Sequence, residues 1–209
     1  MARPKGTPGN AKERIERGAM RLFATKGYAA TTTKDIAEAA GIKDASIYNH
    51  FKGKRDLFES VVEGELRHLT KVLRETGAMA DPADSSEAYG TLDVALLAPV
   101  VLDSFRPLFA DERIVCLRHM LEANRYEDER CGELFREIFI ERPLAIEEAV
   151  FSRLVEAGVF GECDPGVAAA EFYGSAFLLL MADAPWDEVS KSIEGHLREF
   201  IGLHTRRGV

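Results

Sequence analysis

The sequence predicts an all-α protein with a small basic N-terminal helical unit followed by a larger acidic helical domain. Three observations lead there. Apolar residues in the first part of the chain recur at helical spacing, and after residue 87 no stretch alternates with the period of two that marks a strand. Charge is also divided between the two parts. Residues 1–55 hold 12 Lys/Arg and 5 Asp/Glu, a net charge of +7. Because the formal net charge of the whole chain is −8, residues 56–209 carry a net charge of −15. A basic end of this kind attracts phosphate.

The first helix is predicted to begin at Asn10, an N-cap with Glu13 at the third helical position. Its buried stripe follows at i, i+4, i+7 and i+8, and Gly27 ends it. Residues 1–9 are rich in Pro, Gly and basic side chains, which predicts a flexible arm. Arg3 and Lys5 of this arm could reach a DNA minor groove, or belong to a solvated tail.

Two short helices and a tight turn are predicted next. Thr32 can cap a helix that starts at Thr33, with Asp35 in the capping-box position. Gly41 supplies the positive φ that ends this helix. The following helix, residues 44–50, begins at Asp44 as its N-cap and buries Ile47 and Phe51. This is the layout of a helix-turn-helix, whose second helix enters the DNA major groove.

The N-terminal quarter of the chain resembles the DNA-binding domain of the TetR family of transcriptional regulators. Many spaced positions agree at once, which makes the match more specific than one short motif. The matching residues are Phe23, Gly27-Tyr28, Thr32-Thr33, Ile36-Ala37, Ala40-Gly41-Ile42, Ile47-Tyr48, His50-Phe51, Lys54 and Leu57-Phe58. Three positions depart from the family pattern: Lys43-Asp44 replaces a hydroxyl residue followed by a basic one, and Ala45 replaces the usual Gly.

Nine residues are predicted to contact DNA. Thr33 and Lys54 are expected at phosphates, near the first turns of their helices. Asn49 could pair with adenine, and Asp44 could accept from cytosine. The resemblance assigns phosphate contacts to Tyr48 and His50, although Tyr48 could equally pack on Ile42 and a lone histidine is usually a surface residue. The complete set is Thr33, Lys34, Lys43, Asp44, Ser46, Tyr48, Asn49, His50 and Lys54.

The domain boundary is predicted between residues 53 and 54, giving a helix-turn-helix domain (1–53) and a helical effector-binding and dimerisation domain (54–209). Helices are expected at about 54–76, 87–105, 111–124, 128–157, 166–183 and 186–204, with a loop at 77–87. Asp164-Pro165 marks one start with an N-cap and a proline in the first turn. Pro143 should kink or split the helix that contains it.

The last two helices carry more apolar surface than one neighbour can cover, which predicts a two-fold dimer built as a four-helix bundle. The alternative is that the same surface is buried within one chain. The residues expected at the interface are Val167, Phe172, Ala176, Leu180, Val189, Ile193, Leu197 and Phe200.

The resemblance implies that the C-terminal domain binds a small effector. Aromatic walls with a few polar groups suit a hydrophobic or amphipathic ligand, although aromatic residues at helical spacing are more often simple core. The candidates are Phe105, Phe109, Arg118, His119, Asn124, Phe139, Phe151 and Phe177. The pair Glu147-Glu148 reads as a solvated helix face.

Other functional classes are not supported by the sequence. It lacks the Gly-x-Ser-x-Gly, phosphate-loop and His-Glu-x-x-His motifs, so we expect neither an enzyme nor a bound cofactor. Cys116 and His119 lie one helical turn apart without enough further ligands to predict a metal site. Three unpaired cysteines, the absence of a signal-like N-terminus and apolar runs too short to span a bilayer predict a cytoplasmic protein without membrane association.

The sequence therefore predicts a homodimeric transcriptional regulator that binds a palindromic double-stranded DNA operator, with a small hydrophobic or amphipathic effector releasing it as a repressor. The alternative is a DNA-binding protein of the same fold whose C-terminal domain is a protein-interaction platform.

Overall fold

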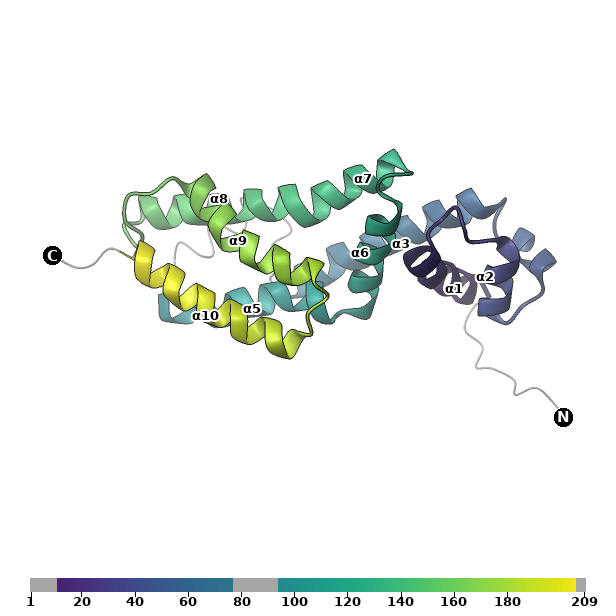
Figure 1. Ribbon diagram of the computed structural model, residues 1–209, viewed down its shortest axis with the longest axis horizontal. Helices are drawn as coiled ribbons and strands as arrows, with labels where there is room; N and C mark the ends of the chain where they lie inside the picture. Colours follow the sequence, from purple (N-terminus) through teal and green to yellow (C-terminus); the bar gives the residue numbers. More distant parts are fainter. Residues whose placement is uncertain (1–10, 77–93, 206–209) are drawn as a thin grey trace. The chain divides into compact units, whose positions relative to one another are not determined.

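The computed structural model describes residues 11–76 and 94–205 (Figure 1). Within these ranges the regular elements are helices, and one isolated β-bridge joins Phe160 to Thr205. The elements are α1 (Ala11–Lys26), α2 (Thr33–Ala40), η1 (Asp44–Asn49), α3 (Lys54–Glu75), α5 (Val94–Ala110), α6 (Glu112–Asn124), α7 (Glu129–Arg136), η2 (Glu137–Glu141), α8 (Arg142–Glu156), α9 (Pro165–Met181) and α10 (Trp186–His204). The predicted all-α fold is confirmed.

The chain divides into two compact units that differ from the predicted domains. The first combines the residues up to Arg67 with Cys116–Gly132, and the second holds His68–Val115 and Glu133–Val209. A boundary at residue 53 would separate most of α3 from the unit in which its first four turns pack. No local pattern indicates that a segment beginning at Cys116 belongs to the first unit, because that association depends on contacts distant in sequence.

The first unit has its own small core. Gly18 of α1 lies against α2, where a Cβ would stand 3.3 Å from that of Ala39, so the two helices approach closely at a residue without a side chain. Phe23, Tyr28 and Phe58 form an aromatic triangle with ring centroids 5.1–5.5 Å apart. Edge-to-face packing of this kind adds to the stabilisation from burial.

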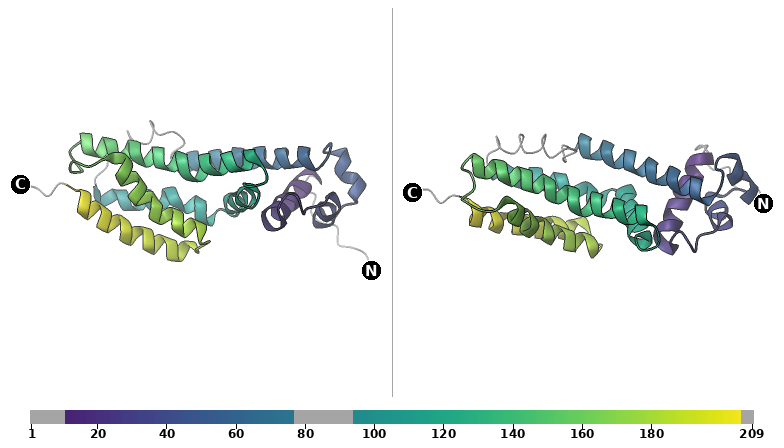
Figure 2. Two further views of the ribbon diagram at one scale, coloured as in Figure 1. Left: turned by 45° about the horizontal axis from the view of Figure 1, so that its top comes forward. Right: turned by 90° about the horizontal axis from the view of Figure 1, so that it is seen from above.

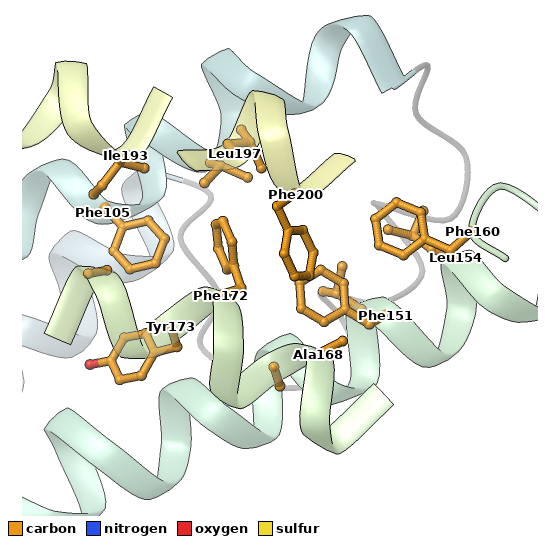
Figure 3. Close-up of a cluster of buried hydrophobic side chains, with 14 of the residues drawn as sticks. Phe105, Phe151, Leu154, Phe160, Ala168, Phe172, Tyr173, Ile193, Leu197 and Phe200 are labelled. Carbon is orange, nitrogen blue, oxygen red and sulfur yellow. The ribbon is translucent and has the colours of Figure 1, made fainter. Parts of the chain in front are cut away.

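The second unit is a bundle in which α8, α9, α10 and α5 pack against one another, and α9 and α10 stay adjacent in both views of Figure 2. Its core is rich in aromatic rings. Phe172 of α9 lies 5.9 Å from Phe151 of α8 and 5.3 Å from Phe200 of α10, ring centre to ring centre (Figure 3). Phe160 stacks on Phe151 at 5.7 Å and joins the loop before α9 to the same core.

Pro143 is accommodated by a turn of π-helix. The predicted helix over 128–157 is present as α7, η2 and α8, with the π turn ending two residues before the proline. Proline has no N–H to donate to the carbonyl four residues earlier, which is that of Phe139. The hydroxyl of Tyr173 in α9 donates to this carbonyl at 2.7 Å. The buried acceptor is thus satisfied from a neighbouring helix.

The other helix predictions agree closely with the structure. The helix predicted at 111–124 is α6, that at 186–204 is α10, and the Asp164 cap is present, accepting from the N–H groups of Gly166 and Val167 at 2.9 and 3.1 Å. The helix expected to end at residue 105 continues to Ala110 through Pro107. The predicted arm and the loop at 77–87 lie outside the described residues.

Candidate nucleic-acid interface and cavity

The helix-turn-helix is fixed by hydrogen bonds at both ends of α2. The hydroxyl of Thr32 accepts from the N–H of Asp35 at 3.1 Å, and the Asp35 carboxylate accepts from the N–H of Thr32 at 2.9 Å. The backbone hydrogen bond from Thr32 is the largest cause that holds the pKa of Asp35 below its ordinary value. Gly41 ends the helix with φ +67°. The predicted capping box and left-handed glycine are both present.

The predicted recognition helix is present as η1, a short 3-10 helix. It is anchored by Ile47, which is fully buried, and by Phe51, which follows it. Lys43, not Asp44, occupies the N-cap, and no side chain caps the first turn. The prediction that Asp44 is the N-cap is therefore wrong: its carboxylate makes no capping hydrogen bond, and Asp44 is the first residue within the element. An element this short gains little from α-helical hydrogen bonds, and 3-10 geometry is used mainly in short segments.

The outer side of η1 consists of exposed polar side chains. Tyr48 is 58% exposed, so more than half of its side chain is open to solvent. Of the remaining predicted contact residues, Lys34, Lys43, Asp44, Asn49 and His50 are exposed, and Thr33 and Ser46 are partly exposed. These residues come from two short elements joined by one turn, and they offer hydrogen-bonding groups of both kinds.

Lys54 has a different position from that expected of a phosphate ligand. Its ammonium group donates to the carbonyl oxygens of Tyr28 at 2.8 Å and Thr31 at 2.9 Å, and lies 4.3 Å from the centre of the Tyr28 ring. These contacts fasten the loop before α2 to the start of α3. With a longer third bond to the carbonyl of Ala29 at 3.5 Å, the ammonium group is occupied inside the protein, a structural role that the sequence did not indicate.

Asn124, predicted to line the effector pocket, is instead a bridge within the first unit. It is 1% exposed. Its side-chain oxygen accepts from the N–H of Tyr28 at 2.6 Å, and its amide nitrogen donates to the carbonyls of Phe23 and Met120 at 3.3 and 2.6 Å. Every strong hydrogen-bonding direction of the side chain except one acceptor position is used, so Asn124 has little capacity for a ligand.

Arg118 and His119 also belong to the first unit and not to the cavity described below. Arg118 is 2% exposed, and its guanidinium lies 3.0 Å from Nε2 of His119 and 3.4 Å from the carboxylate of Glu122. The prediction that Arg118 and His119 line the effector pocket rested on their position in a central helix of the chain, and it is wrong for the cavity found here. The sequence could not show that this part of α6 packs with the N-terminal helices.

The end of α6 and the start of α7 are tied to α3 by four charged side chains of the first unit. Arg55 pairs with Asp128 and, at 2.6 Å, with Glu59, while Arg130 pairs with Glu59. Asp128 also accepts from the N–H of Cys131 at 3.1 Å and so caps α7. Burial raises the pKa of Asp128, but the hydrogen bonds from Arg55 and Cys131 outweigh it, and the net pKa is below its ordinary value.

The second unit contains a cavity of about 80 Å³ between α3, α5, α8 and α9. Most of its wall is apolar, and its polar groups are the side chains of Ser104, Arg142, Glu147 and Tyr173. The full lining is Leu69, Leu73, Ser104, Phe105, Leu108, Ile138, Arg142, Pro143, Ile146, Glu147 and Tyr173. A smaller cavity of about 20 Å³ lies between α5, α8, α9 and α10, and Glu147 lines it as well.

Of the aromatic residues predicted for the pocket, Phe105 lines the larger cavity and Phe151 the smaller one. Phe139 is buried and contributes its carbonyl to the bond with Tyr173, while Phe109 and Phe177 pack on the edge of the core. The prediction that Glu147 belongs to a solvated helix face is wrong, because Glu147 is buried. Its spacing of three, four and seven residues from Val150, Phe151 and Leu154 was the signal that places it on the buried side of α8.

Seven of the eight residues predicted for the dimer interface are buried within the chain, which corrects that assignment. Phe172, Ala176 and Leu180 of α9, and Val189, Ile193, Leu197 and Phe200 of α10, are at most 4% exposed. Val167 alone is exposed, at 56%. The apolar surface of these two helices is covered mainly by α5 and α8, as the sequence alternative had it.

Among the described residues, no helix is both long and apolar enough to cross a bilayer, and no cluster of His, Cys, Asp and Glu side chains is arranged to bind a metal.

Comparison with known proteins agrees with the geometry of the first unit. Residues 15–61 match the family model described as bacterial regulatory proteins, tetR family. Over 64 residues the chain is 41% identical to the transcriptional regulator YvkB of Bacillus subtilis, covering 31% of this chain and 34% of that protein. Over 106 residues it is 35% identical to the transcriptional repressor KstR2 of Rhodococcus jostii, covering 47% of this chain and 52% of that protein. The matched segments thus span about a third to a half of the length of these curated relatives.

The resemblance of folds extends over nearly the whole chain. The solved complex of SmeT with triclosan superposes with a TM-score of 0.61 at 22% identity, covering 96% of this chain and 94% of that one. At this level of identity the likeness establishes the fold. Together with the capped helix-turn-helix, these comparisons show that residues 15–61 match the tetR family of bacterial regulatory proteins and that the chain shares the helical fold of that solved structure.

Proposed function

We propose that the protein is a sequence-specific DNA-binding transcriptional regulator whose recognition element is η1. The observation that carries this proposal is the exposure of Tyr48, Asn49 and His50 on an element that Ile47 and Phe51 anchor in the core. A rigidly held element with polar side chains directed outward is what reading base edges in the major groove requires. KstR2 of Rhodococcus jostii is named a repressor, which favours repression here.

The test is fluorescence anisotropy of the full chain on labelled DNA selected from a random pool, compared with a scrambled duplex of equal length. We expect the selected DNA to bind at least about 1,000-fold more tightly, with an affinity that falls as salt rises. Equal binding of both duplexes at each salt concentration would contradict the proposal.

We further propose a homodimer on a palindromic operator, with the contact on the outer side of α9. Val167 and Leu178 are 56% and 71% exposed and lie 11 residues apart, which returns to nearly the same side of an α-helix. Gly174 lies between them, and a Cβ there would meet nothing within 4 Å. Glu171 lies on the same side between Val167 and Gly174, so the stripe is apolar apart from one exposed carboxylate, and the small Gly174 permits close helix packing across a two-fold axis. Two recognition elements would then read two half-sites.

The larger cavity is the proposed effector site, and a small hydrophobic or amphipathic molecule is the proposed effector that releases DNA. Support comes from its apolar wall with few polar groups and from the fold shared with SmeT, whose complex holds triclosan. The effector acts only if it binds the DNA-free arrangement more tightly than the DNA-bound one. Screening compounds for loss of anisotropy on selected DNA tests this role.

A further inference from the structure

Glu147 is a buried carboxyl group that has no hydrogen-bonding partner in the described part of the chain. It is 8% exposed and lies on the walls of the two cavities described above. Among the described residues, no hydrogen bond or ion pair to its carboxyl group is formed. Buried polar groups are nearly always satisfied, and one that is directed into a cavity is a candidate to be satisfied by a ligand.

The surroundings of Glu147 decide its ionisation. Among the described residues, the cavity walls contributed by α3, α5 and α10 are free of charged side chains, and the titratable groups that face Glu147 are Tyr173 of α9 and Arg142 of α8. The Tyr173 hydroxyl donates its hydrogen bond to the Phe139 carbonyl and not to Glu147, and Arg142 is an exposed member of the lining. Desolvation therefore dominates and raises the pKa of Glu147 to about 8.

At neutral pH the group is thus mostly a carboxylic acid, which can donate one hydrogen bond. A ligand cation would require the carboxylate form, and would have to bind at a wall that already includes the Arg142 guanidinium. A ligand anion placed against Glu147 would lose its hydration among apolar side chains. An uncharged oxygen acceptor requires neither the deprotonation of Glu147 nor the burial of a charge.

We propose that Glu147 determines the specificity of this cavity by donating a hydrogen bond to a carbonyl or ether oxygen of an uncharged, otherwise apolar effector. The inference rests on the proposed role of the cavity as effector site and adds the class of molecule it takes. The cavity of about 80 Å³ is roughly half the volume of one that admits benzene. It holds the oxygen-bearing end of the molecule, and the remainder extends along the lining toward Arg142.

The experiment compares three probes with the same chain length and different head groups: 2-octanone, octylammonium and octanoate. Isothermal titration calorimetry at about pH 6.5 measures their binding to the full-length wild type and to Glu147→Gln, Glu147→Leu and Glu148→Gln. We expect 2-octanone to bind most tightly. Glu147→Gln, whose amide still donates, should stay within about 3-fold of wild type, whereas Glu147→Leu should bind about 5- to 100-fold more weakly. The exposed neighbour variant Glu148→Gln should match wild type.

A pH series separates the role of the proton from that of shape. With a pKa of about 8, about a tenth of the wild-type protein carries the proton at pH 9, so the apparent affinity for 2-octanone should fall about tenfold there. Glu147→Gln should show no such fall. This arm uses only wild type and an isosteric variant, so it remains decisive if Glu147→Leu does not fold.

Three outcomes would overturn the proposal: tightest binding of octylammonium with loss in Glu147→Gln, unchanged 2-octanone binding in a folded Glu147→Leu, or no binding of 2-octanone to wild type at about 10 mM. DNA anisotropy on the same preparations separates this inference from the proposed function. Specific DNA binding with a failed probe series rejects the ligand class alone. If 2-octanone binds in a Glu147-dependent way but the protein shows no specific DNA binding, the proposed regulator function is rejected and the proposed ligand site is retained.

Discussion

The side-chain oxygen of Asn124 accepts a hydrogen bond of 2.6 Å from the backbone N–H of Tyr28, 96 positions earlier in the chain. The amide of the same residue holds the carbonyl of Phe23. One buried side chain thus joins the last turn of α6 to the end of α1 and to the loop that precedes α2. The placement of the helix-turn-helix depends on a residue far outside the segment that matches the family model.

Replacing Asn124 with alanine should lower the free energy of unfolding of the first unit by about 2–4 kcal/mol, because it leaves the Tyr28 N–H and the Phe23 carbonyl buried without partners. Urea denaturation followed by circular dichroism measures the change. Asn49→Ala serves as the exposed control and should leave the midpoint within experimental error. A midpoint for Asn124→Ala equal to that of wild type would show that water takes over these bonds.

Lys54 and Lys34 should separate structural from electrostatic roles. Lys54→Met removes the three bonds to the 28–31 loop and should cost about 1–3 kcal/mol of stability, with weaker DNA binding as a consequence. Lys34→Met, at an exposed position, should leave stability unchanged and weaken binding equally on all sequences, reducing the salt slope by about one. Measuring both quantities for both variants distinguishes the roles. If the two variants were equally stable, the structural role of Lys54 would be rejected and its assignment as a phosphate ligand would be favoured.

Asn49→Ala should change the ranking of DNA sequences more than the overall affinity. An amide that pairs with adenine in the major groove contributes about 1–3 kcal/mol of discrimination against other bases at that position. Competition anisotropy with single-base variants of the selected operator measures it. Tyr48→Phe is the comparison, since removing a hydroxyl from a backbone contact should weaken all operators alike. If the ranking survives Asn49→Ala, the base contact belongs to another residue of η1.

Glu147 should make stability depend on pH. Its pKa in the folded protein is about 8 and its ordinary value is 4.5, so the folded state holds the proton over an interval in which the unfolded state has lost it. Stability is therefore greatest below about pH 4.5 for this group and falls as pH rises through 8, by at most about 5 kcal/mol in total.

Glu147→Gln should remove this contribution. We expect the difference in free energy of unfolding between the variant and wild type to move in favour of the variant between pH 5 and about 9, measured by urea denaturation at each pH. The exposed pair residue supplies the control, since Glu148→Gln should follow the wild-type curve. A constant difference across this range would mean that water enters the cavity and keeps Glu147 ionised.

The interface on α9 can be tested with two leucines two residues apart. Leu178 is 71% exposed and Leu180 is 2% exposed. Leu178→Glu should yield folded monomers by analytical ultracentrifugation with loss of tight binding to a palindromic site, whereas Leu180→Glu should unfold the second unit by burying a charge. Ala123→Glu, an exposed change on α6, should remain dimeric. A dimeric Leu178→Glu protein would place the contact elsewhere.

Local signals in the sequence predicted the local structure well. Thr32, Gly41 and Asp164 each determine a helix end through bonds to residues no more than four positions away, so their roles could be read directly from the sequence. Ile47 and Phe51 were likewise predicted in the core by spacing alone. These features are confirmed by the structure.

The features that were missed depend on distant contacts. Polar residues such as Asn124 and Lys54 look the same in sequence whether they bind a ligand or a backbone carbonyl. Apolar residues of α9 and α10 look the same whether they face a partner or their own core, and only the structure separates Leu178 from Leu180. Glu147 lay within a buried stripe, but its charged neighbour made the pair look solvated.

The π turn before Pro143 sets the rotational phase of the helices on either side of it. Phe135 and Leu154 are 19 residues apart, a spacing that would leave them about 100° apart around an uninterrupted α-helix. A π turn takes up about one additional residue, which brings them back to nearly the same side. Both are 1% exposed. Apolar residues whose spacing in the sequence does not match the α-helical period can therefore still lie on one side of the helix. The Phe139 carbonyl, which Pro143 cannot bond, accepts a hydrogen bond from the Tyr173 hydroxyl.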